Sequence, residues 1–192
     1  DTEENGPGGI QHRDPKTEEW ISLGFEGESV TTIESLADGT LLMALPLEGV
    51  WRSTDQGLNW ELFDFDLETI SPSQNGPRGE HFFEFETTHN GSVYAATWEG
   101  LVRSDDGGQT WNRIHTALQQ TIRDVDLGLD RNGQLLVLMA SYGGGLQLAD
   151  LRGTTAGTLT GSGQGLYLRH AAVTPDFGND GIATVASSGD LL

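Results

Sequence analysis

The chain has 192 residues, 35% of them hydrophobic, and 29 acidic against 10 basic residues give a formal net charge of −19. The length and composition are sufficient for a normal buried core. The acidic balance argues against binding to nucleic acid or to an anionic membrane surface, because both need basic patches. The chain has no cysteine, which excludes disulfides and thiolate chemistry. No apolar run approaches the roughly 18 residues of a membrane-spanning helix, so no transmembrane segment is expected.

The N-terminal residues 1–17 are polar and contain Gly and Pro, which predicts an extended arm. The next segment, residues 18–24, contains Trp20-Ile21-Ser22-Leu23 and is expected to be a strand. It is either the last strand of a preceding structural unit or a strand that joins the final unit and closes a ring.

From residue 32 onward the sequence repeats one pattern of apolar runs and glycine turns. Asn-Gly and Asp-Gly pairs between apolar runs are strong hairpin signals, and each unit predicts four short strands. The turn glycines, which are 52, 42 and 48 residues apart, are Gly39, Gly91, Gly133 and Gly181. The predicted units are residues 32–63, 78–114, 121–159 and 165–192. Together with the segment 18–24 they form one repeat domain over residues 18–192.

Two eight-residue segments share the pattern S-x-D-x-G-x-x-W and begin 51 residues apart. An Asp carboxylate can hold a turn closed by accepting backbone N–H groups, Gly permits a positive φ, and Trp can cover the loop. The pattern therefore predicts a turn between two strands. Its fixed positions are Ser53, Asp55, Gly57 and Trp60 in the first segment, and Ser104, Asp106, Gly108 and Trp111 in the second.

With these residues the chain resembles the Asp-box (bacterial neuraminidase repeat) family, which includes sialidase-like, sortilin-like and photosystem II assembly factor-like proteins. The resemblance implies an all-β fold, a β-propeller of four-stranded antiparallel blades, and a repeat of this length is typical of propellers. About four blade repeats are present, so we expect an incomplete ring or part of a larger propeller. In the family the box lies away from the central binding face, which implies that the eight box residues are structural.

Several members of this family are glycosidases. Sialidase-like members need an arginine triad and a Tyr/Glu pair, and the context of Arg78, Arg123, Arg131 and Arg169 does not match that arrangement. Xyloglucan-active members use two carboxylates across a cleft, separated by roughly 6.5–9.5 Å when the enzyme inverts the sugar configuration. The candidates for such groups, on strands expected near the channel, are Glu34, Glu84, Asp124 and Asp126. Alternation in Glu84-Phe85-Glu86 and Asp124-Val125-Asp126 is explained more simply by one polar face of a strand.

No metal or other cofactor is expected. The stretch Asp124–Gly133 has acids like those of a calcium loop but lacks the terminal Glu. The five histidines contain no i, i+4 pair that would indicate zinc.

The sequence therefore predicts a non-catalytic protein-interaction or assembly scaffold whose partners are other protein subunits. We expect it outside the cytoplasm, as a secreted, periplasmic or cell-surface protein. The alternative is a carbohydrate-active enzyme (a glycoside hydrolase) or a sugar-binding propeller. Binding is expected at the loop Asp64–Gly79, the N-terminal arm and the acidic surface, because long loops on propellers often carry function.

Overall fold

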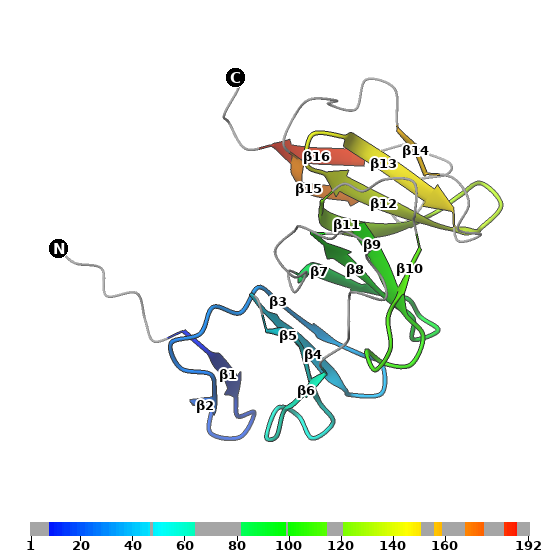
Figure 1. Cartoon of the computed structure of the whole chain (residues 1–192). Helices are drawn as coiled ribbons and strands as arrows, with labels where there is room; N and C mark the ends of the chain where they lie inside the picture. Colours follow the sequence, from blue (N-terminus) through cyan, green and yellow to red (C-terminus); the bar gives the residue numbers. More distant parts are fainter. Residues whose placement is uncertain are drawn as a thin grey trace.

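The structure, a computed structural model, describes most of the chain. Within the described residues it is all-β and contains no helix, and therefore none that could span a membrane. Three four-stranded and two two-stranded antiparallel sheets follow one another along the chain (Figure 1). The predicted binding loop Asp64–Gly79 lies outside the described residues. The described ranges are 8–46, 48–63, 82–98, 100–114, 121–150, 156–158, 168–174 and 183–187.

Each four-stranded sheet is a meander of four consecutive strands. The first sheet contains β3 (Thr32–Ser35), β4 (Leu41–Leu45), β5 (Gly49–Ser53) and β6 (Glu61–Phe63). The second contains β7 (Phe82–Thr87), β8 (Val93–Thr97), β9 (Gly100–Ser104) and β10 (Asn112–Arg113). The third contains β11 (Ile122–Leu129), β12 (Leu135–Ser141), β13 (Gly145–Asp150) and β14 (Ala156–Thr158).

Neighbouring sheets touch through their first strands. Strand β7 contacts both β3 and β11, and β11 contacts β15 (Leu168–Val173), which pairs with β16 (Ala183–Ser187). The sheets are thus blades arranged around their first strands, in an open arc (Figure 1). This arrangement confirms the predicted β-propeller of four-stranded antiparallel blades.

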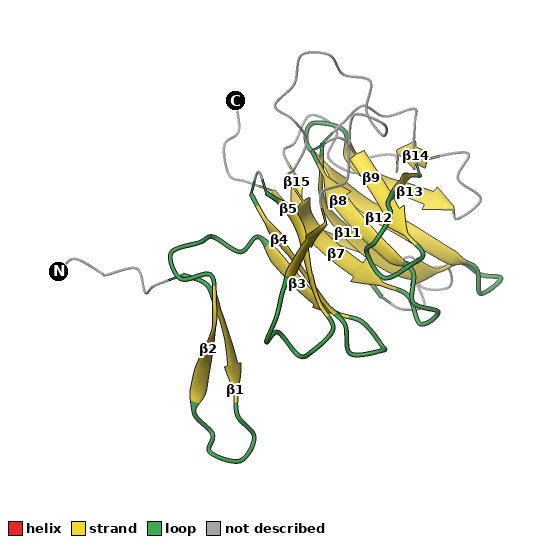
Figure 2. Cartoon of the chain, turned by 60° about the horizontal axis from the view of Figure 1, so that its bottom comes forward, coloured by secondary structure: helices red, strands yellow, loops and turns green. Residues whose placement is uncertain are grey.

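A two-stranded hairpin precedes the first complete blade (Figure 2). We predicted an extended arm over residues 1–17, but the structure forms β1 (Ile10–Arg13) within it, paired with β2 (Trp20–Gly24). The physical reason is a tertiary contact, because Ile10 is buried against Met43 and Leu45 of β4. Strand β2 pairs with β1 and not with β16 in the described structure, so it does not close a ring here.

The core is a series of layers, each between two adjacent sheets. In β4, Leu42 and Ala44 pack against the second blade, whereas Met43 packs toward the β1–β2 hairpin. Strand β8 repeats this alternation: Ala95 faces the first blade and Tyr94 faces the third. In β12, Met139 packs toward the second blade and Leu138 packs toward β15. Both faces of each second strand are therefore buried, which explains why these runs are continuously apolar.

The glycine of each S-x-D-x-G-x-x-W segment lies against a leucine from the preceding sheet. Gly57 and Gly108 have φ of 88° and 87°, a region that favours glycine. A Cβ on Gly108 would lie 2.7 Å from Cδ2 of Leu42, which is fully buried and has no room to move. A Cβ on Gly57 would meet Leu23 at the same distance. These turns therefore help to determine how closely two sheets approach.

We expect Gly108→Ala to destabilise the protein by about 2–4 kcal/mol, because it combines backbone strain with overpacking. The matched control is Gly133→Ala, at a φ of 72° with no atom within 4 Å of the added Cβ. The control is expected to lose only about 1–2 kcal/mol, from strain alone. Urea unfolding of the two variants measures the difference, and equal losses would show that the approach to Leu42 has no energetic consequence.

Candidate functional site

The two S-x-D-x-G-x-x-W segments, here called the first box loop (residues 53–60) and the second box loop (residues 104–111), are closed by their own side chains. In the second, the Ser104 hydroxyl donates to Asp106 over 2.8 Å and accepts the Gly108 N–H over 2.8 Å. Asp106 Oδ1 also accepts the Thr110 N–H at 2.8 Å, and Trp111 Nε1 donates to the Gly108 carbonyl at 3.1 Å.

The first box loop has the same connections. Ser53 donates to Asp55 at 2.9 Å and accepts the Gly57 N–H at 2.8 Å, while Trp60 Nε1 donates to the Gly57 carbonyl at 2.8 Å. Hydrogen bonds from Asn59 and Ser53 hold the pKa of Asp55 below its ordinary value. Burial opposes ionisation of Asp106, but the bonds it accepts outweigh burial and lower its pKa as well. Both carboxylates are thus stabilised in the ionised form by the hydrogen bonds that they accept within their own turns.

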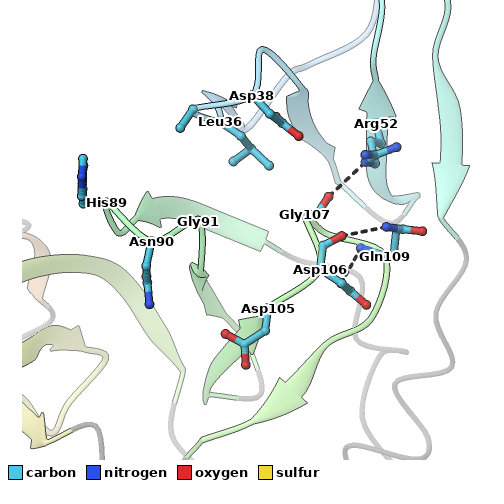
Figure 3. A pocket seen from close by; sticks show the side chains of 11 residues that line it. Leu36, Asp38, Arg52, His89, Asn90, Gly91, Asp105, Asp106, Gly107 and Gln109 are labelled. Carbon is cyan, nitrogen blue, oxygen red and sulfur yellow. Dashed lines mark hydrogen bonds between the residues drawn. The ribbon is translucent and has the colours of Figure 1, made fainter.

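A pocket of about 360 Å³ lies beside the second box loop, between the first and second blades (Figure 3). Arg52 crosses between the blades and donates from Nε to the Gly107 carbonyl at 3.0 Å. The acids of the pocket have partners of their own: Asp38 accepts the Thr40 N–H, and Asp105 accepts the Arg103 guanidinium and the Ser92 hydroxyl. The polar groups here join turns and blades to one another.

The four carboxylates predicted as glycosidase candidates lie on three neighbouring first strands. Three of them accept hydrogen bonds from the next blade. Asp124 accepts the Ala171 N–H at 2.5 Å, and Asp126 accepts the Val173 N–H at 2.6 Å. Glu34 accepts the Thr87 hydroxyl at 3.1 Å. The strands that carry the candidates are β3 for Glu34, β7 for Glu84, and β11 for Asp124 and Asp126.

The electrostatics of this acidic cluster (Glu34, Glu84, Glu86, Asp124 and Asp126) are dominated by burial and mutual repulsion. Burial, followed by the negative charge of Asp126, raises the pKa of Glu86 to about 7. Burial and the Asp124 charge likewise raise the pKa of Glu84. Burial also raises the pKa of Asp124, although the Ala171 N–H and the nearby His170 partly offset it. The described residues contain no group of three or more acidic or histidine side chains arranged to hold a metal ion.

Sequence reasoning did not identify a second pocket, of about 300 Å³, which we call the arginine pocket. Its described lining residues are Trp98, Thr121, Arg123, Tyr142 and Arg169. The register of the first strand slips at the same point in three successive sheets, at Phe83, Arg123 and Arg169. The available sequence signal was a triplet at the start of β7, β11 and β15, in which a residue of variable type separates an apolar residue from a polar one.

Comparison with known proteins supports the fold through structure rather than through sequence. No family model matches the chain, and no curated protein is significantly similar to it in sequence. Many solved structures are similar. PorZ, an essential surface component of the type-IX secretion system of Porphyromonas gingivalis, matches with a TM-score of 0.64 and 16% identity over 94% of this chain and 29% of PorZ.

Two further structures represent other functions. The GH74 xyloglucanase of Xanthomonas campestris matches with a TM-score of 0.55 and 17% identity, over 82% of this chain and 27% of the enzyme. YCF48 bound to D1 peptide matches with a TM-score of 0.55 and 18% identity, over 88% of this chain and 52% of YCF48. At these identities the likeness shows the fold alone. The chain spans between about a quarter and half of the length of these three proteins.

The raised pKa of Glu86 predicts a specific dependence of stability on pH. Between pH 4.5 and about 7 the folded state keeps the Glu86 proton that the unfolded state has lost, so stability falls as pH rises through this window. Because Glu86 is only half-buried, solvent screens its charge. The free energy of unfolding is therefore expected to fall by about 1–2 kcal/mol, less than the full pKa shift of Glu86 would give. Glu86→Gln is expected to remove this loss.

Chemical denaturation at pH 5 and pH 8 measures the effect, and Glu61→Gln on β6 is the matched control because Glu61 is exposed. The variant Glu86→Gln should gain stability relative to wild type at pH 8 and change little at pH 5. An equal response of Glu86→Gln and Glu61→Gln would contradict the assignment of the titration to Glu86.

Proposed function

We propose that this chain is an Asp-box propeller unit that acts as a non-catalytic protein-interaction or assembly module outside the cytoplasm. The single observation that carries the proposal is that acidic side chains on the first strands accept hydrogen bonds from the neighbouring sheet. Asp124 and Asp126 accept backbone N–H groups from the neighbouring strand β15, and Glu34 accepts a hydroxyl from β7. Carboxylates that join blades in this way serve the rigidity of the scaffold.

The local geometry of the box loops supports the Asp-box assignment. Ser, Asp, Gly and Trp of each loop form hydrogen bonds to one another, and these bonds close the loop. We therefore propose that the eight box residues close turns and take no part in binding. A rigid row of blades suits protein recognition, because loops from several blades reach one face and are positioned by the scaffold.

The similar structures support the same proposal. PorZ is described as a bacterial surface component of a secretion system, and YCF48 was solved with a bound peptide. Both are consistent with a role in protein assembly, and PorZ is also consistent with an extracytoplasmic location. The net charge of −19 favours partners with basic surfaces and gives no support to nucleic acid.

The second candidate is a glycoside hydrolase, favoured by Glu86. A carboxyl with a pKa of about 7 close to a second carboxyl is the arrangement that lets one group act as an acid and the other as a base. Against this, Asp126 already accepts N–H groups from Leu127 and Val173. Neither described pocket is lined by Glu86 or Asp126.

Two assays with the full chain test the proposal together. The wild-type chain is expected to release no more reducing sugar from xyloglucan, a mixed-linkage β-glucan and sialyllactose than Glu86→Gln does. Selection of phage-displayed peptides on the immobilised chain is expected to enrich sequences that bind the folded chain saturably and do not bind the heat-unfolded chain. Turnover that Glu86→Gln abolishes and Glu61→Gln retains would replace the scaffold with the hydrolase. A failure to enrich any peptide would also count against the scaffold.

A further inference from the structure

The arginine pocket lies at the opposite end of the blades from the box loops. In the second blade, the box loop follows Ser104, which pairs with Val93 at the start of β8, next to the end of β7. The register slip at Phe83 lies at the other end of β7, beside the β8–β9 turn that carries Trp98. The pocket therefore occupies a face that the box loops leave unused.

Three successive sheets build this pocket. Trp98 comes from the second blade, Thr121, Arg123 and Tyr142 come from the third, and Arg169 comes from β15. The Tyr142 N–H donates to the Thr121 carbonyl at 2.9 Å, which fixes the β12–β13 turn against the start of β11. The irregular residue in each first strand re-aims its side chain, as a β-bulge does.

The guanidinium of Arg123 lies over an aromatic ring in a cation–π contact. Its Cζ lies 4.1 Å from the centre of the Phe83 ring, and the Phe83 and Trp98 rings are 6.5 Å apart. A guanidinium over a ring face is attracted by the ring and keeps N–H groups that can bind a planar acceptor. The Phe83 ring thus holds the Arg123 guanidinium at the pocket.

The two arginines of the pocket lack an anionic counterpart among the described residues. Burial, followed by the positive charge of Arg169, lowers the pKa of Arg123. The ion pairs of the described structure join Arg13 to Glu18 and Arg103 to Asp105, and neither involves the pocket. In a chain with 29 acidic residues, two cations placed together without a described carboxylate indicate a site for an external anion.

We propose that the arginine pocket binds a carboxylate of a partner polypeptide, with Arg123 and Arg169 as the charged contacts and with Trp98 and Tyr142 packing on the adjoining residue. The inference rests on the proposed protein-interaction function and names its site. Arg pairs match the planar geometry of a carboxylate bidentately. Both aromatic side chains reach the surface of the pocket, where Trp98 is 43% and Tyr142 is 53% exposed.

The lining favours a peptide over an acidic sugar. Sugar hydroxyls need several acceptor side chains, and the described lining contains no Asp, Glu, Asn or Gln. Its side-chain hydroxyls are those of Thr121 and Tyr142. A volume of about 300 Å³ suits one or two residues of a peptide rather than an extended chain.

The test titrates the full chain with N-acetyl-Ala-Phe-Ala as the free acid and as the C-terminal amide, with N-acetyl-Ala-Asp-Ala amide, and with glucuronate. Binding is followed by the indole N–H signal of Trp98 in NMR, assigned with Trp98→Phe. The free acid is expected to bind at least about tenfold more tightly than its amide, which is typical of one charge-assisted contact. The aspartyl peptide shows whether a side-chain carboxylate serves as well as a terminal one, and either result supports the site.

Arg123→Gln and Arg169→Gln are each expected to weaken binding of the free acid about tenfold or more. Arg131→Gln is the matched control, because it removes the same charge just beyond the other end of β11 and should leave binding unchanged. Thermal unfolding checks that each variant folds, and Arg169, which is exposed, provides the test if Arg123→Gln does not. If Arg131→Gln and Arg169→Gln lose affinity for the free acid equally, the effect comes from net charge alone and the proposal is overturned.

Affinity of the amide equal to that of both the free acid and the aspartyl peptide, no binding of any peptide, or tighter binding of glucuronate than of the peptides would each overturn the carboxylate-peptide site. The proposed function is judged separately. If phage-selected peptides bind the Arg123→Gln/Arg169→Gln variant as tightly as wild type, the interaction module stands and only this site fails.

Discussion

The second strand of each complete blade buries both faces, and this one constraint governs the rest of the molecule. Alternate residues of β4, β8 and β12 enter different core layers, so every blade depends on two neighbours for its hydrophobic stability. Burial of this kind is the main favourable contribution to folding. In the described part of the chain each core layer lies between two sheets, and stability therefore depends on contacts between neighbours, as in other repeat proteins.

Polar groups reinforce the same contacts at two different places. At the ends where the box loops lie, Gly108 approaches Leu42 and Arg52 bonds to the Gly107 carbonyl across the first two blades. Along the first strands, Asp124 and Asp126 bond to β15. These groups hold the spacing and orientation of blades, and that rigidity keeps side chains at the opposite end in fixed positions.

The two ends of the blades thus differ in chemistry. The box-loop end is made of closed turns whose carboxylates have partners within the protein. The other end carries the register slips, the exposed aromatic side chains and two adjacent arginines. Between them, the acidic cluster couples protonation to stability, because Glu86 is partly buried among other carboxylates. A scaffold function and a carboxylate-binding face are therefore compatible within the same set of blades.

The sequence by itself determined the blade pattern: Asx-Gly turns, continuous apolar second strands and two box loops are local signals with local causes. The carboxylates were also predictable as a polar strand face, but their bonds to Ala171 and Val173 were not. Only the tertiary structure brought Arg123 and Arg169 to one pocket and turned part of the predicted arm into β1. The physical reason is that these outcomes depend on packing between segments tens of residues apart, and local periodicity does not show which segments will meet.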